Sequence, residues 1–259
     1  MARDRTLPRR RACALAAATA TLALAGPAIA APGTQETGPW TAGLATATSL
    51  PRGHDVSSHQ RAVNWSTARA RGARFVYVKA TESTTYRNPY FAGQYDGARE
   101  AGLIRGAYHF ALPNRASGTK QAQYFLRHGG GWTADGWTLP PALDIEYNPY
   151  DSKHKCYGLS KTRMVSWIRA FSDEVRKQTG RRPVIYTNTI WWKLCTGNSR
   201  AFSASHPLWI ARHGTSTPGA LPGGWKYWTF WQYANKGTLP GDQDLFNGSS
   251  SRLKALARG

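Results

Sequence analysis

The stretch Leu139-Pro140-Pro141-Ala142-Leu143-Asp144-Ile145-Glu146 is the part of the sequence from which the fold can be worked out. An apolar run after two prolines predicts a buried strand, and this strand ends in two acids separated by one isoleucine. Residues two positions apart on a strand point to the same face, so Asp144 and Glu146 should face inward and Ile145 outward. Neighbouring carboxylates compete for ionisation, so one pKa should rise and that carboxyl could act as a general acid near neutral pH.

Short strands of the same kind alternate with helical patterns on both sides of this stretch. We expect strands at Gly53–Ser57, Arg74–Ala80, Ile104–Phe110, Ala142–Glu146, Val184–Thr187, Leu208–Ala211 and Tyr227–Tyr233. Helices are expected at Trp65–Arg71, Pro89–Ala101, Thr119–Arg127 and Lys161–Gln178. This alternation predicts an α/β fold with right-handed crossovers. The simplest closed form is a modified, irregular β/α barrel of about eight mostly parallel strands with fewer helices than strands, because Gly- and Pro-rich loops follow Trp191.

Further acids lie near the ends of other predicted strands. In a parallel barrel, catalytic residues gather at the carboxyl ends of the strands. Asp55 ends the first predicted strand, and Asp242 and Asp244 follow the last one by a short loop. Each of these acids taken alone fits a polar turn equally well.

Aromatic residues recur at the same strand ends, among them Tyr108, Phe110, Tyr186, Trp209 and Trp231. Flat aromatic faces beside acids are typical of sugar-binding sites, although each ring also fits an ordinary core. Three histidines, His54, His59 and His109, are expected near this end of the barrel. Because no pair of histidines has the spacing of a zinc site, we expect no metal, and no motif predicts a cofactor.

Composition limits the class of protein. The 259 residues carry 34 Lys and Arg against 14 Asp and Glu, a net charge of +20. Such a chain should bind polyanions, although charge alone does not choose among nucleic acid, anionic lipid and an acidic wall polymer. The chain is 41% hydrophobic, which is sufficient for a sizeable core.

The N-terminal segment has the pattern of a secretory signal peptide. Five arginines in residues 1–11 precede an apolar run from Ala12 to about Ala25 and the small residues Ala28-Ile29-Ala30. The run is short for a membrane span. We therefore predict a signal peptide at 1–30, a flexible leader at 31–50 and a catalytic barrel at 51–259. Of the three cysteines only Cys156 and Cys195 would remain, and in a secreted protein they predict one disulfide.

These residues together resemble the glycoside hydrolase family 25 lysozymes, the muramidases of the Chalaropsis type. The similarity extends from Gly53 to Gly248 and includes His54-Asp55-Val56-Ser57-Ser58-His59-Gln60, Val78-Lys79-Ala80-Thr81-Glu82, Gly106-Ala107-Tyr108-His109-Phe110, Leu143-Asp144-Ile145-Glu146, Ile185-Tyr186-Thr187-Asn188, Leu208-Trp209-Ile210-Ala211, Trp231-Gln232-Tyr233 and Asp242-Gln243-Asp244-Leu245-Phe246-Asn247-Gly248. One departure is Glu82-Ser83, where the family commonly has Glu-Gly.

The resemblance implies hydrolysis of the β-1,4 bond between N-acetylmuramic acid and N-acetylglucosamine in peptidoglycan. It implies Glu146 as the general acid, Asp144 as its partner carboxylate, and Asp55 and Asp242 as two further acids. Substrate contacts are expected from Tyr108, Phe110, Tyr186, Trp209, Trp231, Gln232 and Glu82. Because Asp144 and Glu146 lie on one strand, we expect the substrate's 2-acetamido group to assist, with retention of configuration.

The expected partners of such an enzyme are peptidoglycan glycan strands and anionic wall polymers, not nucleic acid or membrane. We expect a secreted, wall-associated monomer. Three alternatives stay open: a wall-binding barrel without activity, a secreted nuclease and a chitinase. A nuclease would need a metal-ligand cluster or a basic helix with spaced aromatics, and the sequence has neither.

Overall fold

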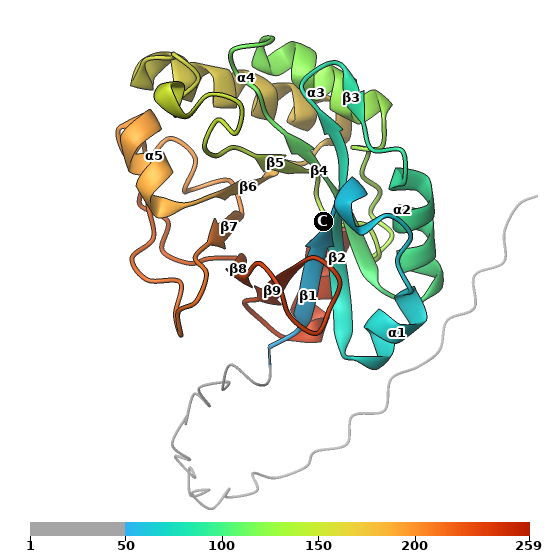
Figure 1. Cartoon of the computed structure of the whole chain (residues 1–259). Coiled ribbons are helices and arrows are strands. Elements are labelled where there is room, and N and C mark those ends of the chain that lie inside the picture. The colour runs from blue at the N-terminus through green and yellow to red at the C-terminus, as the bar shows by residue number, and fades with distance from the viewer. Residues whose placement is uncertain (1–49) are drawn as a thin grey trace, which may run out of the picture. The chain divides into compact units, whose positions relative to one another are not determined.

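Eight strands close into a barrel in residues 50–259, the part of the chain that the computed structural model describes (Figure 1). They are β1 (Arg52–Val56), β2 (Ala73–Glu82), β4 (Ile104–Phe110), β5 (Ala142–Asp144), β6 (Val184–Thr187), β7 (Leu208–Ala211), β8 (Phe230–Ala234) and β9 (Asp242–Phe246). Neighbouring strands run parallel except that β9 is antiparallel to both β8 and β1. The short β3 (Tyr86–Arg87) pairs with the end of β2 outside the barrel. The irregular β/α barrel predicted from the sequence is confirmed.

Six α-helices accompany these strands in the described residues. They are α1 (Trp65–Ala70), α2 (Phe91–Glu100), α3 (Gly118–Arg127), α4 (Lys161–Thr179), α5 (Thr189–Thr196) and α6 (Ser250–Arg258). Asn64 and Ser160 cap α1 and α4, as their positions predict, because each side chain accepts a hydrogen bond from a backbone N–H of the first turn. The connections from β7 to β8 and from β8 to β9 lack helices, as the Gly- and Pro-rich sequence indicated.

The C-terminal part differs from the prediction in four elements. Strand β8 begins at Phe230 instead of Tyr227, and the helices α5 and α6 were not expected. The Asp242-Gln243-Asp244 segment, expected as a loop, is the beginning of β9. Its first two inward residues, Asp242 and Asp244, are acids and the outward Gln243 between them is buried, so the start of β9 lacks the alternation of apolar and polar residues by which a strand is recognised.

Alternation along each strand separates two apolar layers. Phe75, Tyr77, Trp209 and Phe230 belong to the cluster that fills the barrel. Ile145 packs in a different cluster, with residues of the surrounding helices such as Phe171. The predicted outward direction of Ile145 is therefore confirmed, and its neighbours on either side point inward.

A disulfide joins Cys156, in the loop after β5, to Cys195 in α5, with their Cα atoms 5.3 Å apart. The predicted pairing is confirmed. The bond closes a loop with a sequence separation of 39 and should stabilise the fold by about 4 kcal/mol in the chain-entropy model. The predicted signal peptide at 1–30 and nearly all of the leader at 31–50 lie outside the described residues.

The contact between α3 and α4 depends on Gly118. A Cβ atom there would lie 2.3 Å from the backbone oxygen of Trp167. We expect Gly118→Ala to lower the free energy of unfolding by about 2 kcal/mol, because the two helices must separate. Gly93 in α2 is the matched control, because a Cβ there meets nothing within 4 Å. Gly93→Ala should instead raise stability by roughly 0.5–1 kcal/mol. Urea unfolding of both variants measures the difference, and equal effects would contradict this account of the packing.

Candidate active site

Four carboxylates from distant parts of the chain line one cavity of about 240 Å³. Asp55 lies near the end of β1, Asp144 ends β5, Glu146 follows two residues later, and Asp242 begins β9. Since β9 runs antiparallel, its first residue reaches the edge of the barrel at which the parallel strands end. Asp55 and Asp242 are direct partners in the β1–β9 ladder. The barrel therefore brings together all four acids expected to be catalytic.

Burial and mutual repulsion favour the protonated forms of these acids. Burial, with the charge of Asp242 second, raises the pKa of Asp55 to about 7. Burial also raises the pKa of Glu146 to about 7. The pKa of Asp144 lies well above its ordinary value because of burial and the neighbouring Glu146. The cavity can thus hold protons near neutral pH, as an acid catalyst requires.

Gln232 on β8 fixes the position of Asp55. Its side-chain N–H donates to Asp55 Oδ2 at 2.7 Å. Its Oε1 accepts from the Tyr186 hydroxyl at 2.9 Å and lies 2.7 Å from His213 Nε2. Tyr186 and His213 therefore orient the amide so that its donor group faces Asp55.

A fifth acid, Asp244, is fully buried behind Asp55. The indole N–H of Trp209 donates to its Oδ1 at 2.8 Å. Burial and the charge of Asp55 raise the pKa of Asp244 well above its ordinary value. Asp244 therefore favours its protonated form.

The predicted substrate-binding residues divide into two groups. Five line the cavity: Tyr108, Phe110, Tyr186, Trp209 and Gln232. Trp231 lies in the outer apolar cluster, where its indole donates to the Arg212 carbonyl, because adjacent strand residues cannot both face inward. Glu82 lies in the wall of a second cavity.

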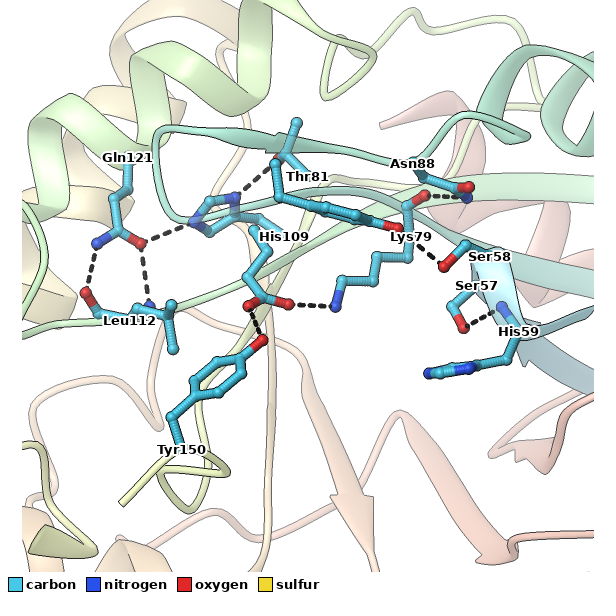
Figure 2. Close-up of polar contacts among 12 residues, drawn as sticks. Ser57, Ser58, His59, Lys79, Thr81, Asn88, His109, Leu112, Gln121 and Tyr150 are labelled. Atoms are coloured by element: carbon cyan, nitrogen blue, oxygen red, sulfur yellow. Dashed lines mark hydrogen bonds and ion pairs between the residues drawn. The ribbon is translucent and has the colours of Figure 1, made fainter.

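Two of the three histidines expected near the acids point away from them. The His54 ring lies 5.7 Å from that of Trp65, and burial lowers its pKa to about 4. His109 is hydrogen-bonded between Thr81 and Gln121, behind the strands (Figure 2). Only His59 lines the cavity. In residues 50–259, no group of three or more His, Cys, Asp or Glu side chains could hold a metal ion.

His213, which was not predicted from the sequence, lies two residues beyond β7 on an exposed loop. Burial raises the pKa values of Glu146 and Asp242, and the charge of the His213 imidazole acts in the opposite direction and lowers both. The only signal in the sequence was its distance from the end of a predicted strand. That signal is weak because a loop residue has no fixed direction.

The comparison with known protein families decides the class of this site. The family model described as Glycosyl hydrolases family 25 matches residues 54–242. The chain belongs to this family. It is a glycosidase of the lysozyme type, as the resemblance of its motifs implied.

Individual relatives agree with this assignment. The chain is 50% identical to an N,O-diacetylmuramidase of Chalaropsis sp over 80% of its length and 99% of the relative. It is 48% identical to Lysozyme M1 of Streptomyces globisporus, covering 81% of this chain and 72% of the relative. The crystal structure of a bacterial lysozyme from Streptomyces coelicolor superimposes with a TM-score of 0.78 and 47% identity, covering 82% of this chain and 98% of that one.

Proposed function

We propose that this family 25 enzyme hydrolyses the β-1,4 bond between N-acetylmuramic acid and N-acetylglucosamine in peptidoglycan. The observation that carries the proposal is the set of four carboxylates around one cavity with aromatic walls. Muramidases and lysozymes among its relatives support the choice of substrate. In this proposal Tyr108, Tyr186 and Trp209 pack against the sugar, and Asp55 and Asp242 lie beside it as the further acids of the site.

Glu146 is proposed as the general acid and base. Its raised pKa of about 7 means that it carries a proton at the start of the reaction in weakly acidic solution. It would donate this proton to the oxygen of the departing sugar. It would then remove a proton from the water that completes hydrolysis.

Asp144 is proposed to act through the substrate's 2-acetamido group. One of its buried oxygens, Oδ1, has no hydrogen-bond partner among residues 50–259. The acetamido N–H could fill this position, and such a hydrogen bond favours the ionised carboxylate. The charged Asp144 would orient the amide so that its oxygen attacks the anomeric carbon.

Assistance by the acetamido group predicts retention of configuration, because two displacements follow one another at the anomeric carbon. We expect the first product detected by proton NMR to carry the β-anomer at its new reducing end. The α-anomer would appear only later, by mutarotation. If the α-anomer is formed first, water attacks directly and the proposed role of Asp144 is wrong.

The bond that is cut can be identified by mass spectrometry. Purified walls are digested, the products are reduced with borohydride, and the released muropeptides are sequenced. Reduced N-acetylmuramic acid at the new end supports the proposal, whereas reduced N-acetylglucosamine contradicts it. Chitin oligomers provide the control, since their rapid cleavage would favour a chitinase.

We also propose that the protein is secreted and acts at cell walls. The Cys156–Cys195 disulfide supports this, because such bonds persist in oxidising compartments. The net charge of +20 supports attraction to anionic wall polymers. In residues 50–259, no helix is both long and apolar enough to cross a membrane.

A further inference from the structure

A second cavity, of about 400 Å³, lies beside the first. Its lining comes from the end of β2 and the turn after it, from the β4–α3 connection and from the loop after β5. The residues that matter here are Glu82, Ser83, Thr84, Leu112, Arg115 and Tyr150. Apart from Glu82, which was expected to contact the substrate, none of them has a role in the proposed cleavage of the glycan.

The ion pair between Lys79 and Glu82 separates the two cavities. Lys79 lines the first cavity and Glu82 the second. Lys79 Nζ lies 2.6 Å from Glu82 Oε2, and the Tyr150 hydroxyl donates to Glu82 Oε1 at 2.5 Å. Lys79 and Tyr150, both labelled in Figure 2, thus contact different oxygens of the Glu82 carboxylate. A substituent on a sugar bound in the first cavity therefore needs to extend only past this ion pair to reach the second cavity.

Ser83 occupies an unfavourable backbone conformation in the wall of the second cavity. Its φ is 51°, in the left-handed region, and the side chain is 5% exposed. A residue with a Cβ atom typically incurs about 1–3 kcal/mol in such a conformation, so residues of this kind gather at ligand-binding sites. The Ser83 hydroxyl makes no hydrogen bond to any residue in 50–259. It is thus a buried polar group whose backbone is strained and whose hydroxyl is available to a ligand.

Arg115 supplies the charge of this cavity. It is exposed and forms no ion pair within residues 50–259, whereas the other charged lining residue, Glu82, is neutralised by Lys79. A guanidinium with free donors binds carboxylates in a bidentate manner. A sugar ring offers no charge to such a group, but a peptide with free carboxylates does.

We propose that this second cavity binds the short, carboxylate-bearing peptide attached to the N-acetylmuramic acid residue that is cleaved. Arg115 would pair with a peptide carboxylate, the Ser83 and Thr84 hydroxyls would contact the peptide backbone, and Leu112 would contact its methyl groups. The inference rests on the proposed function, because it places the muramic acid in the neighbouring cavity. It makes the enzyme selective for glycan that still carries its peptides.

The test compares two substrates that differ in the peptide and in the lactyl carboxylate that removal of the peptide exposes. Soluble glycan fragments are assayed before and after an amidase removes the peptides. We expect Arg115→Ala to lower kcat/KM about three- to fivefold on peptide-bearing fragments, mainly through KM, and to leave the rate on stripped fragments unchanged. Arg163→Ala, at an exposed site on α4 that forms no ion pair in the described residues, removes the same charge elsewhere and should change neither rate.

A second variant tests the strained residue. Ser83→Gly removes the hydroxyl and relieves the backbone, so it should raise the Tm while it raises KM for peptide-bearing fragments alone. Equal losses on both substrates, or no loss on either for Arg115→Ala, would overturn the inference. A wild-type enzyme that cleaves neither substrate would instead refute the proposed function, so the two failures can be distinguished.

Discussion

Replacing Glu146 by Gln is expected to lower kcat on purified walls by about 10³-fold, because the amide cannot give its proton to the departing sugar oxygen. The amide has nearly the shape of the protonated carboxyl, so binding to walls should persist. The rate of appearance of new reducing ends measures the loss. Glu100→Gln, at an exposed carboxylate that ends α2, is the matched control and should keep full activity. Activity of the Glu146 variant within tenfold of wild type would contradict the acid role.

The pH dependence of the Tm shows whether the Glu146→Gln variant folds as the wild type does. Folding raises the pKa of Glu146 to about 7 from an unfolded value of about 4.3. The stabilisation from its bound proton is therefore complete below about pH 4 and is lost as the pH rises through about 7. The amide of Glu146→Gln stays neutral throughout this range. Its Tm at pH 8 should equal or exceed that of wild type, and any advantage should disappear at pH 4.

Replacing Asp144 by Asn is expected to lower kcat by about 10²–10³-fold, because the carboxylate that orients and stabilises the attacking amide is lost. Its Oδ1 is buried with no partner among the described residues, which leaves a position for the substrate's N–H. The measurement is again the rate of reducing-end formation, on peptidoglycan from the same preparation.

A modified substrate distinguishes this role from direct attack by Asp144. Glycan that has lost its N-acetyl groups is assayed with wild type and with Asp144→Asn at high enzyme concentration. If Asp144 acts through the acetamido group, the substitution should cost little on the deacetylated glycan, because the interaction is already absent. A loss as large as that on normal glycan would show that Asp144 acts on the sugar itself.

The parts of the fold that followed from the sequence are those with a strong local pattern. Apolar strands such as Val184–Thr187 and capped helices such as Lys161–Thr179 lie close to their expected positions. Strand β9 did not follow, since two of its inward residues are acids and its pairing with β1 joins distant parts of the chain. Such pairing is set by barrel closure, which no short window of sequence records.

Site residues could be predicted where they lie on a strand, because side chains on a strand point alternately to its two faces. Asp144 and Glu146 could be placed on one face because Ile145 separates them. The same rule, applied to Trp231 and Gln232, would have selected only Gln232, which lines the cavity. His213 could not be placed in this way, because it lies on a loop whose path depends on tertiary contacts.

The antiparallel pairing of the last strand with the first also has a consequence during biosynthesis. Asp55 is among the earliest barrel residues to leave the ribosome, and its ladder partner Asp242 is among the latest. Gly241, at φ 76°, makes the turn just before Asp242, where a Cβ atom would lie 2.0 Å from the Asp55 carbonyl oxygen. A nascent or prematurely terminated polypeptide without β9 therefore lacks one of the four acids, so the proposed site is assembled only after β9 has been synthesised and has paired with β1.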